Sequence, residues 1–211
     1  GMDFIGPYTF TSGRMFLGFA TLIPFFFIFE FKKVKETNLN LKIVIGYLIL
    51  LGFFLAGGNI LQQVSLLYTD VANSAIFTVL YVVIVPIIAY FLFSKKIHRS
   101  VWLAVFMCLI GGLLLSEINN LRVRYGDSLV IIGAFFWAFH IIYISKFLKI
   151  FNFPITIATF QCFFGAIFCF IPAVTFEYIS FQLLLMESRE LLYAGVLSSG
   201  IAFLLQVYGQ Q

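Results

Sequence analysis

Two stretches of the chain, PYTFTSGRMFLGFATLIPFFFIFE at residues 7–30 and PITIATFQCFFGAIFCFIPAVTFE at residues 154–177, align without a gap at an offset of 147. Each is long and apolar enough to cross a membrane as a helix, which takes about 20 residues. The identical pairs include a proline, a glycine and a final Phe-Glu, so a phenylalanine-rich composition does not explain them. They are Pro7/Pro154, Thr9/Thr156, Phe16/Phe163, Gly18/Gly165, Phe29/Phe176 and Glu30/Glu177. The chain therefore contains an internal repeat.

The composition around this repeat is that of an integral membrane protein. Of the 211 residues, 62% are hydrophobic and 10% are charged, whereas soluble domains carry roughly 25% charged residues. A soluble globule of this size has too little interior to bury that much apolar surface. The composition thus excludes a soluble enzyme, a disordered chain and a nucleic-acid-binding domain. The three cysteines lie in apolar runs and show no disulfide framework or metal-ligand spacing.

Apolar runs of membrane-spanning length occur seven times, and none alternates in polarity as the strands of a transmembrane barrel do. The predicted spans are residues 8–29, 43–66, 71–93, 101–117, 127–146, 154–176 and 190–209. The fold class that we expect is an all-α integral membrane protein with about seven transmembrane helices.

The loop charges predict an orientation. Nine Lys and Arg residues follow the first, third and fifth spans, against three on the opposite side, and an excess of Lys and Arg marks cytoplasmic loops. The start of this chain is then on the outer side of the cell inner (plasma) membrane. The outer start has no signal peptide, and the cytoplasmic end lacks the basic loop expected there. We therefore expect a fragment of a longer protein. The nine cations are Lys32, Lys33, Lys35, Lys42, Lys95, Lys96, Arg99, Lys146 and Lys149, and the three are Arg122, Arg124 and Arg189.

The repeat is predicted to be inverted. Its second copy comes five helices after the first, and because five is odd, the copy enters the membrane in the opposite direction. Inverted-topology repeats are typical of secondary transporters, in which two similar halves exchange conformations to open one side and then the other. We expect a single transmembrane domain, with residues 1–147 holding most of the first five-helix repeat and residues 148–211 the start of the second.

Three stretches resemble EamA-type members of the drug/metabolite transporter superfamily. They are residues 68–93, with a Thr-x-x-Ala junction at Thr69–Ala72 and Pro86 late in the helix, residues 126–147, a Gly-start, Trp-Ala helix, and GPYTFTSGRMFLG. The resemblance implies ten helices, built as five plus five inverted, of which this chain lacks the first, ninth and tenth. It also implies export of small organic metabolites or drugs across the cytoplasmic membrane, without a cofactor.

Arg14 is the most unusual residue of the predicted spans, because a cation inside a membrane helix costs about 2.5–3.5 kcal/mol on insertion scales unless it pairs or reaches the surface. One interpretation places it at a water-filled cavity, where it meets an anionic group of the substrate. The other lets its long side chain reach the lipid headgroups or a helix end. Its repeat mate is the neutral Gln161.

Amide side chains within the spans are the next candidates for lining a substrate cavity. Gln62 and Gln63 lie near Arg14 in depth, Asn59 lies one turn deeper, and Gln161 and Gln206 lie in the opposite half of the membrane, as inverted symmetry requires. In the repeat alignment, Gln62 corresponds to Gln206 at an offset of 144. Because amides in hydrocarbon need partners, the alternative is hydrogen bonding between helices, worth about 0.6 kcal/mol per bond.

Aromatic and hydroxyl groups near the middle of the membrane complete the set. Tyr81 and Trp137 lie about ten residues into their helices, far from the interfacial belts where such rings are common, and Thr78 is one turn from Tyr81. They line an aromatic pocket for an amino-acid-like or amphiphilic solute, or they pack against other helices. His140 is a candidate proton carrier, although a neutral, hydrogen-bonded role suits its lack of a nearby carboxylate better.

The predicted function is therefore a secondary transporter, with a small-molecule substrate and the lipid bilayer as partners and no nucleic acid. A coupling proton or ion and a homodimer are open alternatives. We expect no enzyme, because the sequence has neither a catalytic motif nor a cluster of catalytic side chains at one depth. A polar-lined channel is the nearest rival function, followed by an intramembrane enzyme and a membrane scaffold.

Overall fold

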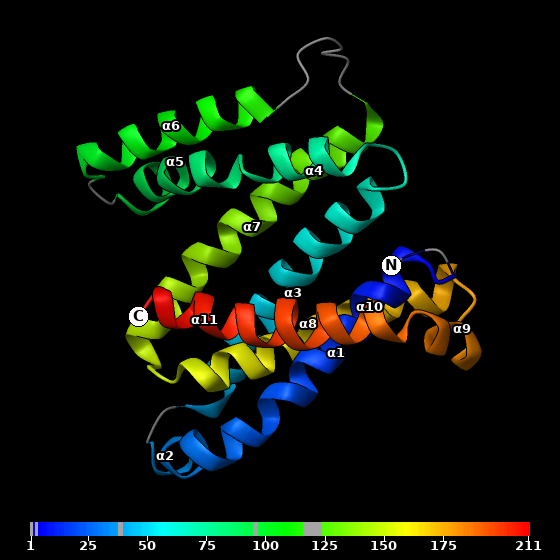
Figure 1. The fold of residues 1–211 in the computed structure, drawn as a ribbon. Helices are drawn as coiled ribbons and strands as arrows, with labels where there is room; N and C mark the ends of the chain where they lie inside the picture. The colour runs from blue at the N-terminus through cyan, green and yellow to red at the C-terminus, as the bar shows by residue number, and fades with distance from the viewer. Residues whose placement is uncertain (1, 3, 38–39, 95–96, 116–123) are drawn as a thin grey trace. The chain divides into compact units, whose positions relative to one another are not determined.

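The computed structural model describes residues 2, 4–37, 40–94, 97–115 and 124–211, and every regular element in those ranges is helical (Figure 1). The chain divides into two units, which are described separately. The first unit comprises Gly1–Ala56 and Tyr143–Gln211, and the second comprises Gly57–Ile142.

The first unit contains the two copies of the repeat. Its own elements are α1 (Pro7–Phe25), the π-helical turn η1 (Phe26–Glu30), α2 (Phe31–Glu36), α8 (Pro154–Phe176), α9 (Phe181–Met186), α10 (Ser188–Leu192), the π-helix η3 (Tyr193–Ile201) and α11 (Ala202–Gly209). The second unit has α4 (Val71–Thr78), α5 (Tyr81–Phe93) and α6 (Arg99–Leu115). Two long helices, α3 (Leu41–Ser65) and α7 (Tyr125–Ile150), contribute to both units.

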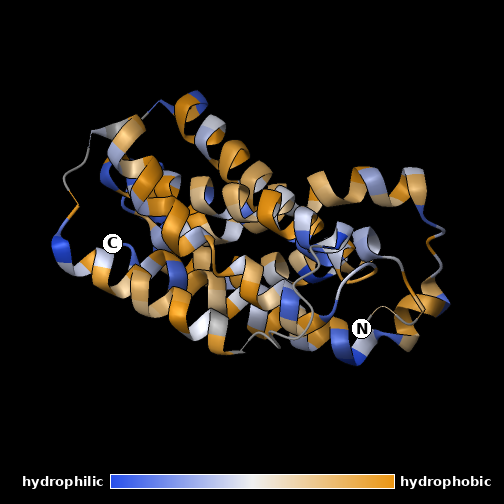
Figure 2. Ribbon diagram, turned by 90° about the horizontal axis from the view of Figure 1, so that it is seen from above, coloured by the Kyte–Doolittle hydropathy of each residue, from blue (hydrophilic) through white to orange (hydrophobic). Residues whose placement is uncertain are grey.

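Six helical segments are long and apolar enough to cross a membrane, and each matches a predicted span. They are Pro7–Glu36, Leu41–Ser65, Val71–Leu92, Tyr125–Ile150, Pro154–Phe176 and Ser188–Gly209. The remaining prediction, 101–117, corresponds to α6, whose apolar part Arg99–Gly112 is shorter. Residues 116–117 and the cations Lys95, Lys96 and Arg122 lie outside the described residues. Figure 2 shows apolar residues along the helices, with hydrophilic ones mostly near helix ends.

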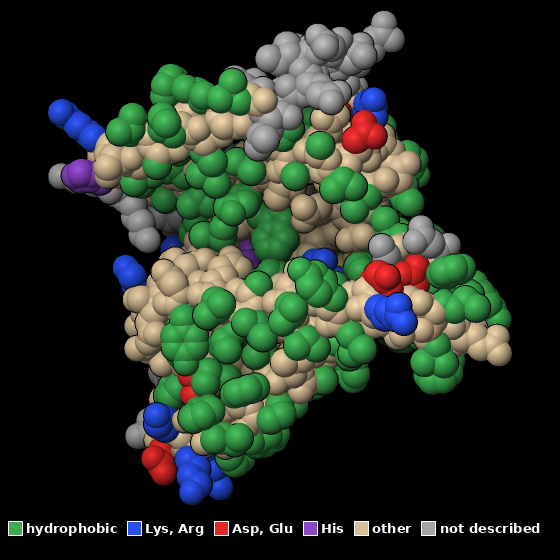
Figure 3. All heavy atoms as spheres, in the orientation of Figure 1, with side chains coloured by type: hydrophobic (Ala, Val, Ile, Leu, Met, Phe, Trp, Pro, Cys, Tyr) green, Lys and Arg blue, Asp and Glu red, His purple; other side chains and the backbone are tan. Residues whose placement is uncertain are grey.

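The surface supports the assignment to a membrane. Large apolar side chains such as Phe27, Ile28, Phe91 and Phe170 are more than half exposed. On the face seen in Figure 3, apolar side chains cover most of the helices, and charged ones gather mainly at helix ends. A lipid environment satisfies such a surface, whereas water does not.

Helices α1 and α8 lie side by side and run in opposite directions (Figure 1). At one end, Glu30 accepts hydrogen bonds from the backbone N–H groups of Ile155 and Thr156, the second and third residues of α8. At the other end, Glu177 accepts hydrogen bonds from the N–H groups of Tyr8 and Thr9 of α1. The offset of 147 maps each bond onto its counterpart. These reciprocal caps are the contacts that an inverted repeat requires.

Small residues bring the repeated helices close at two equivalent crossings. A Cβ on Gly18 of α1 would lie 3.0 Å from Cβ of Ser199 in η3. A Cβ on Gly52 of α3 would lie 2.5 Å from Cβ of Phe164 and 2.9 Å from the backbone nitrogen of Gly165 in α8. The same offset relates Gly18 to Gly165 and Gly52 to Ser199. The inverted repeat of the predicted fold thus extends from α1 and α8 to their neighbours, while the assignment of residues 1–147 and 148–211 to separate units stays a prediction.

We expect Gly52→Val to prevent close packing of α3 on α8 and to abolish a stable fold. The valine side chain meets backbone atoms of α8 rather than flexible side chains, and overpacking of this kind costs about 1–3 kcal/mol or more. The measurement is the recovery of monodisperse protein in detergent and its thermal unfolding midpoint. Gly46→Ala, in the same helix, is the matched control, because a Cβ at residue 46 meets nothing within 4 Å. Equal midpoints for both variants would contradict the prediction.

Candidate functional site

The ten predicted cavity residues divide between the two units. Arg14, Gln161 and Gln206 belong to the first unit, and Asn59, Gln62, Gln63, Thr78, Tyr81, Trp137 and His140 belong to the second. Each group is considered within its own unit.

In the second unit, the third predicted span is broken at its middle. Helix α4 ends at Thr78 and α5 begins at Tyr81. Across the break, Leu80 donates its N–H to the carbonyl of Phe77, and Val82 donates to Val79, so the backbone tightens to i→i+3 bonding. Breaks of this kind present backbone carbonyls at mid-membrane depth, where transporters bind substrates and ions. The predicted residues Thr78 and Tyr81 flank this break.

A line of hydrogen bonds ties the end of α3 to α4. Gln62 donates from Nε2 to Oγ1 of Thr78 over 3.1 Å, and Thr78 donates to the carbonyl of Ser74. Ser65 donates to the carbonyl of Gln62, and its hydroxyl lies 3.2 Å from that of Ser74. The structure therefore brings Gln62 and Thr78 together, as partners in a contact between helices. This contact favours the packing interpretation of Gln62 over a side chain that is free to meet substrate.

We expect Gln62→Leu and Thr78→Val to be energetically coupled. Each variant removes one partner of the same bond, so the double variant should lose little more stability than either single one. The expected coupling energy is about 0.6 kcal/mol, the average for such bonds in membrane proteins. Unfolding of the two single variants and the double variant in mixed micelles measures it, and strictly additive losses would contradict the contact.

Helix α7 brings Trp137 and His140 together. Their rings meet edge to face, with centroids 5.9 Å apart, and the side chain of His140 is fully buried. The indole of Trp137 occupies the space beside Gly58 of α3, where a Cβ would lie 3.0 Å from the indole nitrogen. Asn59, the next residue, is also buried. These groups form a packed polar cluster between α3 and α7.

Tyr81 and Gln63 complete the predicted set in this unit. Tyr81 packs against the buried residues Ile88, Ala138 and Ile142 of α5 and α7. Gln63 is half-buried on α3 beside Gln62. No contact in the described structure assembles all seven residues of this unit around one ligand-sized space, so their cavity role stays a prediction.

In the first unit, Arg14 points toward α8. Its Nε atom is buried, and its guanidinium lies within electrostatic range of the thiols of Cys162 and Cys169. Gln161, its repeat mate, is fully buried, and Gln206 is half-buried on α11. The direction of the Arg14 side chain favours the interpretation in which the charge faces the protein interior rather than the headgroups.

Several polar contacts near the helix ends were not predicted from the sequence. Asp127 is buried and accepts hydrogen bonds from Thr69 Oγ1 and from the backbone N–H of Arg124. Arg124 forms an exposed ion pair with Asp70 at 2.6 Å. The signal for Asp127 was its place in the first turn of a helix, where a carboxylate caps free N–H groups. Among the described residues, no three His, Cys, Asp or Glu side chains gather as a metal site.

Comparison with known proteins gives one consistent result. The model of the EamA-like transporter family matches residues 1–117 and 124–211. An uncharacterized transporter of Archaeoglobus fulgidus is 27% identical over 162 residues, which cover 77% of this chain and 47% of that protein. This chain therefore spans about half the length of that curated relative.

A solved structure shows that the fold itself is known. The crystal structure of another protein superposes on this chain with a TM-score of 0.71 at 17% identity. The match covers 97% of this chain and 70% of that one. The predicted all-helical membrane fold is confirmed by the apolar helices and this superposition, and the predicted family is confirmed by the family model. The chain is a multi-pass membrane protein and belongs to the EamA-like transporter family.

Proposed function

We propose that the protein containing this chain is a secondary transporter. It binds small organic metabolites or drugs from the cytoplasmic side and exports them by alternating access. The observation that carries the proposal is the reciprocal capping of α1 and α8 by Glu177 and Glu30. Two antiparallel copies of one motif with equivalent contacts can exchange conformations, and that exchange opens opposite sides of a membrane in turn.

In this proposal, the predicted residues of each unit bind substrate within their own unit, whereas Gln62 holds α3 against α4 through its bond to Thr78. Arg14 supplies a positive charge for an anionic or carboxylate group, while Tyr81 and Trp137 offer aromatic faces to an amino-acid-like or amphiphilic solute. The break between Thr78 and Tyr81 supplies backbone carbonyls for a coupling ion, and His140 is the candidate carrier of a coupling proton. The bilayer is the cell inner membrane, with the basic loops in the cytoplasm, and a homodimer is compatible with this arrangement.

The test is exchange in liposomes that contain the full-length protein. Liposomes are loaded with an unlabelled mixture of amino acids and amphiphilic amines, and the uptake of the same radiolabelled mixture is followed. Alternating access predicts saturable uptake that is stimulated by the internal substrate, because the loaded carrier returns faster than the empty one. A flux that rises without saturation and ignores the internal substrate supports the channel instead, and absence of flux above empty liposomes contradicts both.

A further inference from the structure

The two capped ends of the α1–α8 pair have the same chemistry but different strength. At the Glu30 end, three hydrogen bonds reach one carboxylate: N–H of Ile155 to Oε1 at 3.1 Å, and both N–H and Oγ1 of Thr156 to Oε2 at 2.7 Å. Glu30 is only 6% exposed. This end is therefore fully bonded and closed to solvent.

The Glu177 end lacks one of these bonds. The N–H groups of Tyr8 and Thr9 reach Oε1 and Oε2 of Glu177 at 2.9 and 2.7 Å, oxygen for oxygen as at the other end. The Thr9 hydroxyl, which corresponds to that of Thr156, is buried and bonds to no described residue. Glu177 itself is half-buried, whereas Glu30 is buried. The second cap is thus weaker than its equivalent.

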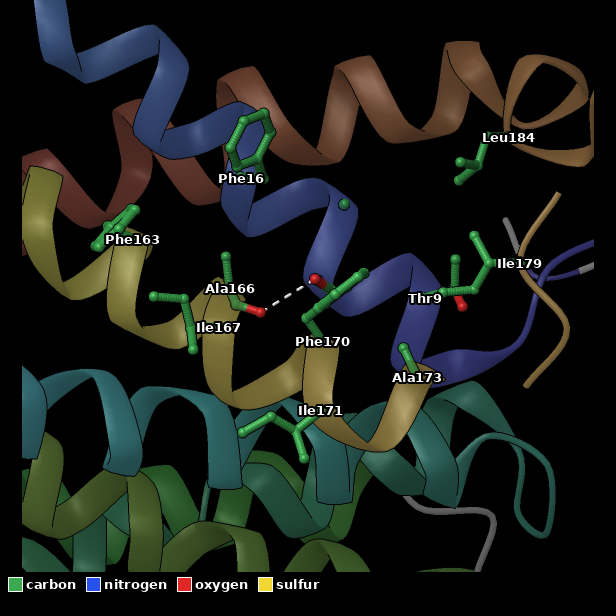
Figure 4. Close-up of a pocket in the computed structure, with 12 residues that line it drawn as sticks. Thr9, Phe16, Phe163, Ala166, Ile167, Phe170, Ile171, Ala173, Ile179 and Leu184 are labelled. Carbon is green, nitrogen blue, oxygen red and sulfur yellow. Dashed lines mark hydrogen bonds between the residues drawn. The ribbon is translucent and has the colours of Figure 1, made fainter. Parts of the chain in front are cut away.

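Packing behind the caps differs in the same sense. At the Glu30 end, the rings of Phe26 and Phe160 meet edge to face at 5.2 Å and fill the space between the helices. The offset of 147 replaces them with Ala173 and Gly13 at the Glu177 end. A cavity of about 400 Å³ lies there, lined by Thr9, Gly13 and Ala173 among others (Figure 4). Apart from Thr9 and Ser12, its lining is apolar and includes the side chains of Phe163, Phe170 and Ile179 (Figure 4).

We propose that the Glu177 end of the α1–α8 pair is a gate, which separates and closes during transport, while the Glu30 end is its hinge. The gate is defined by Glu177, Tyr8, Thr9 and Ala173, and the hinge by Glu30, Ile155, Thr156 and Phe26. Separation of α1 from α8 at the gate breaks two hydrogen bonds and the tilted contact of the Tyr8 and Phe176 rings, whose centroids are 6.2 Å apart. Separation at the hinge breaks three hydrogen bonds and the closer edge-to-face contact of Phe26 and Phe160. The proposal rests on the proposed transport function, for which it identifies the end that moves.

Hydrogen–deuterium exchange of the full-length protein in nanodiscs tests this proposal directly. The amides of residues 8–9 and 155–156 donate hydrogen bonds to the two carboxylates, so their exchange reports opening at each end. We expect residues 8–9 to exchange at least about tenfold faster than residues 155–156, because local openings with fewer bonds and contacts are more frequent. Equal exchange at the two ends overturns the proposal.

Two substitutions at equivalent positions make the test sharper. Ala173→Phe gives the gate the ring that Phe26 supplies at the hinge, and it should slow exchange at residues 8–9 while leaving residues 155–156 unchanged. Phe26→Ala removes that ring and should raise exchange at residues 155–156 toward the rate at the gate. If either variant changes the exchange rates at both ends equally, the substitution acts on the whole fold, and the assignment of the gate is overturned.

A gentler pair covers the case in which a ring substitution prevents folding. Thr156→Val removes a hydroxyl that bonds to Glu30, so exchange at residues 155–156 should rise. Thr9→Val removes a hydroxyl that makes no bond to the described residues, so exchange at residues 8–9 should stay near that of the wild type. Equal effects of the two variants would mean that the ends are equivalent, which overturns the assignment of gate and hinge.

The exchange and transport experiments distinguish failure of the gate from failure of the proposed transport function. If uptake is saturable and stimulated by internal substrate but both ends exchange equally, the transport function is supported and the gate is overturned. If residues 8–9 exchange faster but no uptake occurs, the opening motion is supported and the proposed transport function is overturned. A slowed gate in Ala173→Phe with correspondingly slower uptake supports both.

Discussion

Arg14→Ala is expected to abolish transport by the full-length protein while its insertion into the membrane stays normal. Arg14 lies within a span, and its side chain is turned toward the thiols of α8. In the proposed function, this charge pairs with an anionic group of the substrate. Loss of one partner of a buried charge pair costs about 2–5 kcal/mol, which corresponds to roughly 30- to 4000-fold in affinity. Insertion should not suffer, since alanine removes a charge that costs free energy in the membrane.

The measurement for Arg14 is uptake of the labelled substrate mixture into liposomes, with membrane insertion followed by carbonate extraction. Arg14→Lys is the matched control and should keep part of the activity, because it retains the charge but loses the planar guanidinium. Gln161→Ala, at the equivalent repeat position, should have a smaller effect, since no charge is removed. Wild-type uptake by Arg14→Ala would show that the charge does not meet the substrate.

Glu30→Ala is expected to destabilise the protein more than any other removal of a single carboxylate in the repeat. The substitution leaves two backbone N–H groups and one hydroxyl of α8 without their acceptor in a buried place. Unsatisfied buried groups cost about 1–3 kcal/mol each, of which relaxation recovers a part, so we expect a loss of roughly 2–4 kcal/mol. Glu177→Ala removes two bonds at a half-buried site and should cost about 1 kcal/mol, as for an ordinary helix cap.

Thermal unfolding of both variants in the same detergent checks this order. Glu36→Ala, at an exposed position near Glu30, is the control and should leave the midpoint unchanged. A midpoint for Glu177→Ala as low as that for Glu30→Ala would show that the two caps are energetically equal, which would also weaken the distinction between hinge and gate.

The repeat shows how far the sequence could predict the fold. Glu30 and Glu177 were recognised as an identical pair at an offset of 147, and that offset proved to relate their hydrogen bonds as well. The spans followed from length and hydropathy alone, because the bilayer sets one length for every helix that crosses it. The family followed from motifs that lie along most of the chain.

The sequence did not predict the roles of those same glutamates. Glu30 was identified as one of a repeated pair but without a partner, and it lies buried at the N-terminus of α8, more than 120 residues away along the chain. Asp127 stood at the start of a predicted span, and its bonds from Thr69 and Arg124 were not predicted. Hydropathy identifies a charged residue at a helix end but not the distant helix that it caps.

The candidate site was predictable in its residue types and less so in its contacts. Gln62, Thr78 and His140 were identified as polar side chains within the predicted spans, where such groups are costly. Their partners depend on which helix faces are in contact, and that depends on small residues such as Gly58, whose missing Cβ admits the indole of Trp137. The break at Val79 and Leu80 left no clear signal, because both are ordinary apolar residues and neither Gly nor Pro stands there.

By itself, the sequence determined that this protein is a bundle of membrane helices with an inverted repeat, because hydrophobic length and repeated residues are properties of the chain alone. Only the tertiary structure decided that Glu30 and Glu177 cap each other's helices, that Gln62 bonds to Thr78, and that one end of α1 and α8 is packed by phenyl rings while the other encloses a cavity. These features arise from contacts between residues far apart in the chain. Hydrogen bonds and packing act over a few ångströms in space, and distance along a sequence carries no such information.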